Sequence, residues 1–238
     1  MINFTEIIID KSMRSIARGL AANRLKTVAS GLENIPARGP ALIAARHYHH
    51  LFDGLALFAA IPRRFHVVVT LDWAQNKPIR FFFATINQLA RWPTLLRGDA
   101  LLRDGNGSRK LFSQRDVQRY RRRAMQQSVD LLTEGRLLVI FPEGYPNIDP
   151  TYTPKTKPNE FLPFKAGFIN IVDAAEKRLK QKIPIIPAGL RYTQGSPWMG
   201  YLQFGSPVYR DDSISKEELI DKVEKAVKQL SALNRPQL

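Results

Sequence analysis

Short apolar runs alternate with longer segments of helical periodicity through most of this chain. The runs have the length and composition of strands, and in the segments between them apolar residues recur every three or four positions. The pattern predicts strands at residues 27–32, 41–46, 65–71, 94–97, 137–141, 184–192 and 199–208. It predicts helices at residues 52–61, 78–90, 115–133, 166–180 and 216–233. Such alternation predicts a single α/β domain, in which a mostly parallel or mixed sheet of about seven strands is flanked by helices.

The first 23 residues predict an additional, amphipathic helix. One face carries the apolar residues Ile9, Met13, Ile16 and Leu20, and the basic residues Lys11, Arg14 and Arg18 gather on roughly the opposite side. A helix of this kind either lies in a membrane interface or packs its apolar face on the domain that follows. We therefore divide the chain into a helical segment, residues 1–26, and a main domain, residues 27–238.

Two helix starts and two loops stand out locally. Ser113 with Asp116, and Ser215 with Glu218, have the spacing of a capping box. Residues 103–110 are polar and contain glycine, and residues 144–164 are interrupted by five prolines. A loop as long as 144–164 within a domain is more often functional than idle.

Charge and composition narrow the classes of function. The chain has 36 Lys and Arg against 21 Asp and Glu, a net charge of +15, which indicates an anionic partner such as nucleic acid, a membrane surface or a phosphorylated substrate. It has no cysteine, which excludes disulfides, a thiolate nucleophile and Cys-ligated metal sites. No apolar stretch is long enough to cross a bilayer, and the N-terminus does not have the pattern of a secretion signal. We expect a cytoplasmic protein without a transmembrane helix.

The densest polar cluster, Arg-His-Tyr-His-His at residues 46–50, follows an apolar strand and precedes Asp53. The carboxyl end of a strand is where open α/β sheets place their ligands. A histidine there can act as a general base toward a hydroxyl, with a nearby carboxylate that fixes its tautomer. The alternatives are a metal site built from the three histidines and a polar loop with a structural role, and no metal is our expectation.

Other segments supply weaker candidates. The apolar run 137–141 ends in Pro142, Glu143 and Gly144, which either displays the carboxylate at a strand end or leaves it in solvent. Arg97 follows a short apolar run and by itself predicts a surface charge. Two prolines in the run 183–190 predict an edge or bulged strand with a structural role in the core.

These four segments, in this order, resemble the glycerolipid acyltransferase family, of the lysophosphatidic acid acyltransferase type. Members carry Asn-His-x-x-x-x-Asp, an arginine block, Phe-Pro-Glu-Gly-Thr-Arg, and a Val/Ile-Pro-Ile-Val-Pro block. The corresponding segments here are residues 46–53, 94–97, 141–144 and 183–187. Linking segments at 30–36, 164–167 and 204–207 are also similar, so the resemblance extends from about residue 28 to residue 207.

The histidine spacing departs from the family pattern, which places the histidine five residues before the aspartate. Here position 48 is tyrosine, and His47, His49 and His50 lie six, four and three residues before Asp53. The match at the strand end favours His47, whereas residues three or four apart share a helix face and favour His49 or His50. We place His47 first, His49 close behind and His50 third.

A second departure concerns the acceptor. The family's Thr-Arg after the glycine is replaced by Tyr145 and Pro146, and in the family that arginine is implicated in binding the acceptor phosphate. Arg97, Lys165 or Arg46 are candidates to replace it.

The resemblance implies acyl transfer from an acyl thioester, acyl-CoA or acyl carrier protein, to the hydroxyl of a lysophospholipid or glycerol phosphate. The histidine would be the general base, Asp53 would support it, and Arg97, Glu143 and Gly144 would bind the acceptor. No cofactor is expected. Backbone N–H groups at the start of helix 51–61 are candidates to stabilise the oxyanion.

The excess positive charge then predicts peripheral association with an anionic membrane. Candidate contacts are the N-terminal helix and four arginines, Arg119, Arg121, Arg122 and Arg123, which as an alternative form a solvated helix face. The alternatives for function are a catalytically inactive, lipid-binding relative and a basic nucleic-acid-binding protein. We expect no nucleic-acid partner, because the chain has none of the motifs of such proteins.

Overall fold

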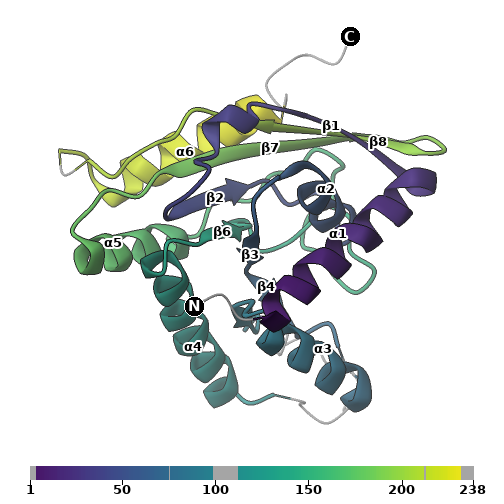
Figure 1. Ribbon diagram of the computed structural model, residues 1–238, viewed down its shortest axis with the longest axis horizontal. Coiled ribbons are helices and arrows are strands. Elements are labelled where there is room, and N and C mark those ends of the chain that lie inside the picture. The colour runs from purple at the N-terminus through teal and green to yellow at the C-terminus, as the bar shows by residue number, and fades with distance from the viewer. Residues whose placement is uncertain (1–3, 75, 99–111, 212, 232–238) are drawn as a thin grey trace.

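A six-stranded sheet runs through the computed structural model, which describes residues 4–74, 76–98, 112–211 and 213–231 (Figure 1). Its strands, in spatial order, are β1 (Leu25–Ser30), β8 (Trp198–Phe204), β7 (Ile185–Thr193), β2 (Ala41–Ala45), β6 (Leu137–Ile140) and β3 (Phe65–Val67). Neighbouring strands are parallel except for β7 and β8, which are antiparallel. The predicted α/β class with a mixed sheet is confirmed.

One predicted strand, residues 65–71, is split between two sheets. The N–H of Val68 donates to Val139 on β6, and the N–H of the next residue, Val69, donates to Pro93. From there β4 (Val69–Thr70) pairs in parallel with β5 (Thr94–Leu95) in a separate two-stranded sheet. The seven predicted strands are therefore eight, because the chain exchanges one partner strand for another within a single apolar run.

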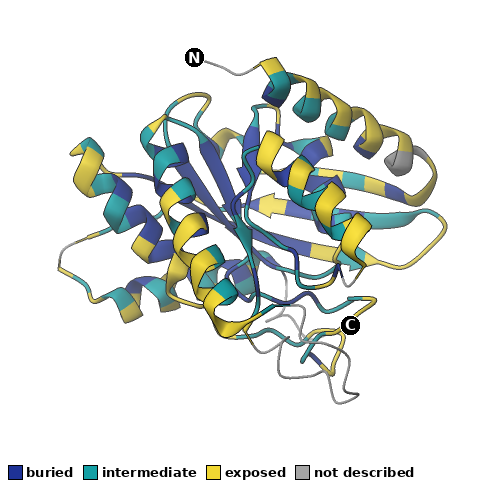
Figure 2. Cartoon of the chain, turned by 90° about the horizontal axis from the view of Figure 1, so that it is seen from below, coloured by how far each residue is buried: buried dark blue, intermediate teal, exposed yellow. Residues whose placement is uncertain are grey.

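Helices cover both faces of the main sheet. The helices are α1 (Phe4–Arg24), α2 (Phe52–Ala60), α3 (Lys77–Leu89), α4 (Gln114–Thr133), α5 (Gly167–Leu179) and α6 (Lys216–Leu230), with a 3₁₀ turn η1 (Leu32–Asn34). Alternate residues of β2 point to opposite faces, so Ala41 and Ile43 pack with α1 and α2, and Leu42 and Ala44 pack with α4, α5 and α6. Figure 2 shows the central strands buried between these helices, whose outward surfaces are exposed, whereas the edge strand β1 also has exposed positions.

Both predicted capping boxes are present. The Ser113 hydroxyl accepts the N–H of Asp116, whose carboxylate accepts the N–H of Ser113, and Ser215 and Glu218 do the same at the start of α6. Each pair satisfies two backbone donors that the first helical turn leaves free.

Helix α1 packs on α2 with a face that only partly overlaps the predicted apolar stripe, of which Met13 contacts the core. Ala17 is fully buried while Ile16 is 48% exposed, and the side chain of Leu20 lies outside the described residues. Arg14, expected on an outward basic face, donates instead to the carbonyl oxygens of Phe58 and Ile61 at the end of α2. Those carbonyls lack partners within their own helix, so an arginine from the neighbouring helix satisfies them.

The predicted loops and the double-proline strand can now be placed. Residues 144–164 form no helix or strand, as expected, whereas residues 103–110 lie outside the described part of the chain. Strand β7 is in the interior of the sheet and its first six residues are buried, so the edge alternative is wrong and the expected role in the core is confirmed. Its pairing with β8 begins at Ala188, so Pro187 lies just before that ladder and its missing N–H costs no bond there. Among the described helices, none combines the length and the apolar character needed to cross a bilayer.

Candidate active site

The candidate residues meet at one edge of the sheet. Strands β2 and β6 are parallel neighbours, with Ala44 opposite Ile140, so the segments that follow them leave the sheet side by side. His47 lies two residues beyond β2, and Glu143 lies three residues beyond β6. Two motifs nearly a hundred residues apart in sequence are thus adjacent at the carboxyl edge, where open α/β sheets bind ligands.

His47 and Asp53 form a direct pair. Nδ1 of His47 lies 2.8 Å from Oδ2 of Asp53, and the histidine side chain is 17% exposed while the carboxylate is buried. Because Asp53 lies in the first turn of α2 and His47 precedes that helix, the six-residue spacing is bridged by a turn rather than by a helix face. Within the described part of the chain, Nε2 of His47 makes no hydrogen bond, which leaves that nitrogen accessible to a hydroxyl.

The Asp53 carboxylate accepts three further hydrogen bonds. The N–H groups of Tyr48 and His49 donate to Oδ2, at 2.7 and 3.1 Å, and the hydroxyl of Tyr192 donates to Oδ1 at 2.8 Å. Burial raises the pKa of Tyr192 well above its ordinary value, so the phenol stays protonated and remains a donor. These contacts with the main chain and with Tyr192 fix the orientation of the carboxylate toward His47.

Tyr192 was not among the residues expected from the sequence. It lies near the end of β7, and its ring stacks on that of Tyr48, with 5.2 Å between ring centroids. The sequence places it within a long apolar strand, and nothing in that pattern distinguishes it from other core aromatics. Only the parallel pairing of β7 with β2 brings it to Asp53.

His49 and His50 have different surroundings from His47. Nδ1 of His49 accepts the N–H groups of Leu51 and Phe52, at 3.2 and 3.3 Å, so this side chain caps the start of α2. Burial, with a smaller effect from the charge on His50, lowers the pKa of His49 to about 4. The N–H donors expected to stabilise an oxyanion at this helix start are therefore bound to His49. His50 is exposed, and its Nδ1 lies 3.3 Å from the carbonyl oxygen of Ile148.

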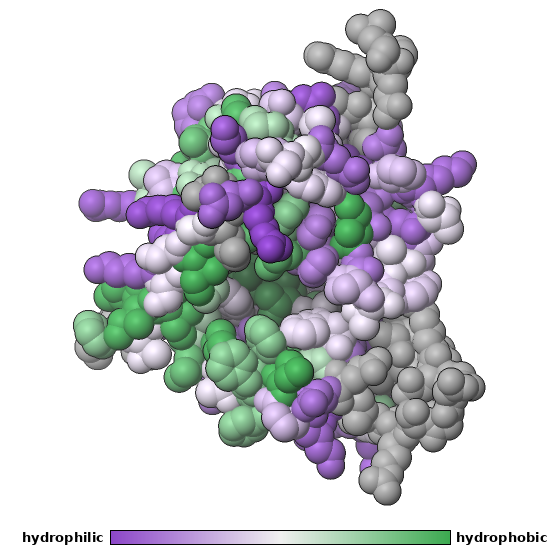
Figure 3. Space-filling model, turned by 90° about the vertical axis from the view of Figure 1, so that its right-hand side faces the viewer, coloured by the Kyte–Doolittle hydropathy of each residue, from purple (hydrophilic) through white to green (hydrophobic). Residues whose placement is uncertain are grey.

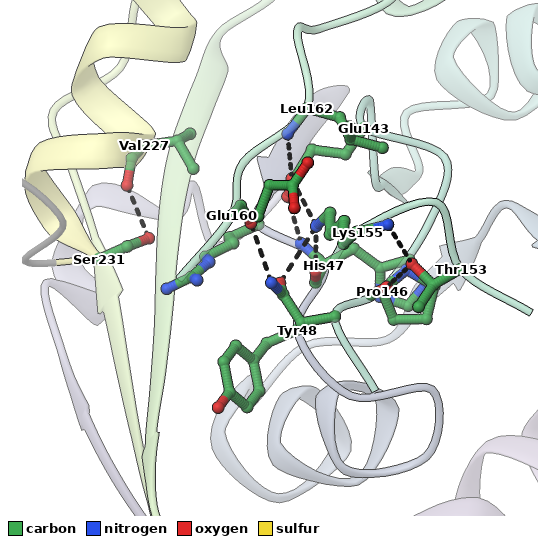
Figure 4. Close-up of polar contacts among 12 residues, drawn as sticks. His47, Tyr48, Glu143, Pro146, Thr153, Lys155, Glu160, Leu162, Val227 and Ser231 are labelled. Atoms are coloured by element: carbon green, nitrogen blue, oxygen red, sulfur yellow. Dashed lines mark hydrogen bonds and ion pairs between the residues drawn. The ribbon is translucent and has the colours of Figure 1, made fainter. Parts of the chain in front are cut away.

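Glu143 and Lys155 hold the main chain of His47 from both sides (Figure 4). Oε1 of Glu143 accepts the N–H of His47 at 2.8 Å, and Nζ of Lys155 donates to the carbonyl oxygen of His47 at 2.9 Å. The two side chains form an ion pair of 2.6 Å, and both are completely buried. Burial lowers the pKa of Lys155, although the Glu143 carboxylate opposes the effect. Glu143 also accepts the N–H of Leu162, so its observed partners are protein groups.

The proline-rich loop carries Lys155 to this position. Ile148 exchanges hydrogen bonds with the main chain of Tyr48 and His50, and the Asn147 side chain donates to the carbonyl oxygens of Lys157, Pro158 and Glu160. The sequence marked this loop as functional by its length but gave no reason to single out Lys155, because a lysine in a polar loop is ordinarily solvated.

Arg97 is not the surface charge that its short apolar run suggested. Its Nε and Nη2 bind Asp72 Oδ2 at 2.8 and 2.7 Å, and its guanidinium lies 4.3 Å from the centroid of the Tyr145 ring. Lys165 approaches the same ring, with Nζ 5.6 Å from the centroid. Gly144 has φ 78°, and a Cβ there would lie 3.0 Å from the Lys165 Nζ. Arg97 and Lys165 are therefore two cations at the turn that follows Glu143.

Arg46, the third candidate for phosphate binding, is buried in the sheet. Its Nη1 donates to the carbonyl oxygen of Leu190, and its guanidinium lies 5.1 Å from the centroid of the Tyr48 ring. Burial lowers its pKa. The structure thus groups Arg97 and Lys165 beside Tyr145 and places Arg46 among side chains of the core.

A metal site was the alternative for the three histidines. Over the described ranges, no group of three His, Asp or Glu side chains is arranged so that it could hold a metal ion. His47 is paired with Asp53, and His49 accepts backbone N–H groups, so both have protein partners in this fold.

Comparison with known proteins agrees with the motifs. Residues 26–191, more than half of the chain, match the acyltransferase family. The chain belongs to the acyltransferase family, and the family predicted from its motifs is confirmed. No protein of curated function matches the sequence significantly.

The fold is similar to that of the 1-acyl-sn-glycerophosphate (LPA) acyltransferase PlsC from Thermotoga maritima. The two structures superpose with a TM-score of 0.59 at 19% sequence identity, over 98% of this chain and 81% of that one. The family match thus gives the class, an acyltransferase, and the structural likeness shows that the two chains share a fold.

Proposed function

We propose that this protein transfers a fatty acyl group from an acyl thioester to the hydroxyl of a phosphate-bearing lipid or glycerol acceptor. The observation that carries the proposal is the His47–Asp53 pair at the carboxyl edge of the sheet, with Nδ1 bound to the carboxylate and Nε2 without a hydrogen bond among the described residues. A carboxylate oxygen can only accept a hydrogen bond, so Nδ1 carries the proton and Nε2 has the free electron pair of a base.

The reaction follows from this tautomer. Nε2 of His47 takes the proton of the acceptor hydroxyl while that oxygen attacks the thioester carbonyl carbon. The C–O bond forms, the tetrahedral intermediate collapses with cleavage of the C–S bond, and the imidazolium returns its proton to the departing thiolate. Asp53 stabilises the imidazolium between the two proton transfers. The products are the ester and the free thiol, and no acyl-enzyme is needed.

His47 is preferred over His49 for the role of base because of their hydrogen-bond partners. His49 uses Nδ1 to accept two backbone N–H groups, and no carboxylate contacts its ring among the described residues. Its pKa of about 4 also makes it a weak base at neutral pH. Glu143 fits a positioning role better than the direct substrate contact expected from the sequence, because its carboxylate binds His47, Leu162 and Lys155.

Arg97 and Lys165 support a phosphate on the acceptor. They approach the Tyr145 ring at the turn after Glu143, where the family has an additional arginine. An arginine and a lysine beside the same ring are suited to bind a phosphate. Lysophospholipids and glycerol phosphate both carry that group, so the assay below compares acceptors with and without an acyl chain.

The test is acyl transfer from labelled acyl-CoA, and separately from acyl carrier protein, to a panel of lysophospholipids, glycerol 3-phosphate and an uncharged lipid alcohol in detergent. We expect transfer to a phosphate-bearing acceptor, with a fall of about 10²–10⁴-fold in His47→Ala. His49→Ala and His50→Ala are the matched controls and should retain most of the activity. Absence of transfer with every donor and acceptor would instead favour the inactive, lipid-binding alternative, and equal losses in His47→Ala and His49→Ala would contradict the choice of base.

A further inference from the structure

The outward side of α3 carries several apolar side chains, with polar residues between them. At 3.6 residues per turn, Ile79, Phe82, Ile86 and Leu89 fall on one side, and Phe81 lies about 100° around the helix from Phe82. Phe81 is 76% exposed and Phe82 is 60% exposed, and Ile79 and Leu89 are also exposed. We call these five residues the α3 face. Exposed aromatic side chains clustered in this way are unusual on a soluble surface and indicate an interaction site.

The opposite side of α3 is already anchored to the protein. Phe83 and Ala84 pack with Leu71, Ala74 and Leu96 in a small core that also includes Val117 and Tyr120 of α4. The helix is therefore held by one side, and the α3 face needs no rearrangement to become available. Figure 3 shows apolar side chains gathered around a hollow on the side of the molecule to which α3 belongs.

The charges around the α3 face are positive. Helix α3 contains Lys77 and Arg80 and no acidic residue. The adjacent first half of α4 carries Arg115, Arg119, Arg121, Arg122 and Arg123, with Asp116 as its acidic residue. Asp116 is bound by Ser113 and Arg119. Apolar side chains bordered by cations match an anionic bilayer, in which the headgroups are negative and the region beneath them is apolar.

The anchored side of α3 is linked through neighbouring residues to the candidate active site. Trp73 makes an edge contact with Phe83, and the neighbouring Asp72 binds Arg97. Arg97 in turn lies over Tyr145, two residues after Glu143. The segment that anchors α3 is therefore the one that binds Arg97 beside the candidate active site.

We infer that the α3 face inserts into the interface of an anionic phospholipid bilayer. A second copy of the chain is the less favourable occupant, because each copy has a net charge of +15 and would bring its own α4 arginines to the contact. The inference extends the expected peripheral association by naming α3, instead of the N-terminal helix, as the inserted element. It does not depend on the proposed reaction, since binding requires no turnover.

The test is co-sedimentation of the full chain with vesicles of phosphatidylcholine and phosphatidylglycerol, without acyl donor. We expect the partition coefficient of Phe81→Ser/Phe82→Ser to be at least about tenfold lower than that of the wild type, because two aromatic side chains no longer enter the interface. The matched control is Val28→Ser/Tyr209→Ser, which changes two residues that are 51% and 50% exposed elsewhere, and it should bind as the wild type does. The wild type should also bind more weakly to vesicles of phosphatidylcholine alone than to the mixed vesicles, because the cations then lack anionic headgroups.

Several outcomes would overturn the inference. Unchanged binding of Phe81→Ser/Phe82→Ser, or an equal loss in the control, would each contradict it. A third variant, Phe4→Ser/Ile8→Ser, changes two exposed residues of α1, and a loss of binding confined to it would assign the contact to α1. A wild-type dimer in sedimentation equilibrium that Phe81→Ser/Phe82→Ser dissociates would assign the face to a second copy. Transfer to an acceptor in detergent should be unchanged in this variant, so a failed catalytic proposal and a failed membrane contact give different results.

Discussion

The Nζ of Lys155 lies 2.6 Å from Oε2 of Glu143, and the same two side chains bind the carbonyl oxygen and the N–H of His47. An ion pair with no exposure to solvent thus fixes both polar groups of the residue that carries the proposed base. A buried pair of this kind contributes little net stability by itself, but it is costly to break from one side. Its value here is that it orients the main chain of His47.

Lys155→Met should destabilise the fold and displace His47. It leaves a buried carboxylate without its cation, for which we expect a loss of about 3–5 kcal/mol in the free energy of unfolding. Lys155→Met/Glu143→Gln should lose less than the sum of the two single variants, because no unpaired charge is left. Urea denaturation of the four proteins measures this coupling. Additive losses would mean that the ion pair is not formed.

The same variants report on catalysis when the assay is run where each is fully folded. Lys155→Met should lower kcat more than it raises KM, because Lys155 contacts the main chain of the base and the proposal gives it no contact with the acceptor. Lys155→Arg, which keeps the charge, should recover part of kcat. An effect confined to KM would instead indicate a contact with substrate.

Asp53→Asn should remove catalysis while the fold is kept. Asparagine has the same shape and can still accept the N–H groups of Tyr48 and His49, but it does not stabilise a positive imidazolium. We expect kcat to fall by about 10²–10⁴-fold, with vesicle binding unchanged. Activity within tenfold of the wild type would contradict the proposed role of Asp53, and a protein whose natural function is lipid binding would show no activity to lose.

Tyr192→Phe removes one hydrogen bond from Asp53 Oδ1. The change deletes only the hydroxyl, so we expect a fall in kcat of about 10- to 150-fold, which corresponds to about 1.5–3 kcal/mol for a hydrogen bond to a charged acceptor. Tyr201→Phe, on the neighbouring strand, is the control. Since burial raises the pKa of Tyr192, the wild type should keep this bond through pH 10. An ionisation of Tyr192 detected below pH 10 in the ultraviolet difference spectrum would contradict this.

The lowered pKa of His49 predicts that the protein loses stability in mild acid. Its pKa is lowered to about 4 from 6.5, so below pH 6.5 the unfolded chain binds a proton that the folded protein does not. Its contribution is complete above pH 6.5 and is lost as the pH falls toward 4. His49→Asn keeps an acceptor for the start of α2 without titrating. Its midpoint in urea should therefore fall less between pH 7 and pH 5 than that of the wild type. His66, whose pKa burial also lowers, contributes equally to both proteins.

Much of the fold followed from the sequence, because periodicity and capping are local properties. The helices near residues 52–61, 78–90, 115–133, 166–180 and 216–233 are present with boundaries shifted by three residues at most, and both capping boxes form. The pattern predicts residues 65–71 as one strand, since a change of partner strand leaves no mark in an apolar run. The pattern also predicts only part of the face with which α1 packs, because Arg14, expected on the solvent side, donates to a carbonyl oxygen at the end of α2.

The residue types of the site and their order along the chain were readable in the sequence, and they identified the family. The sequence did not determine which histidine contacts Asp53, because spacings of six, four and three residues are all compatible with some turn or helix. Only the path of the chain beyond β2 selects His47. Tyr192 and Lys155 became visible only in the tertiary structure. Parallel pairing of β7 with β2 brings Tyr192 to Asp53, and the folded loop buries Lys155 against Glu143. Neither contact could be predicted, because contacts between distant segments of a chain are set by packing and not by local sequence pattern.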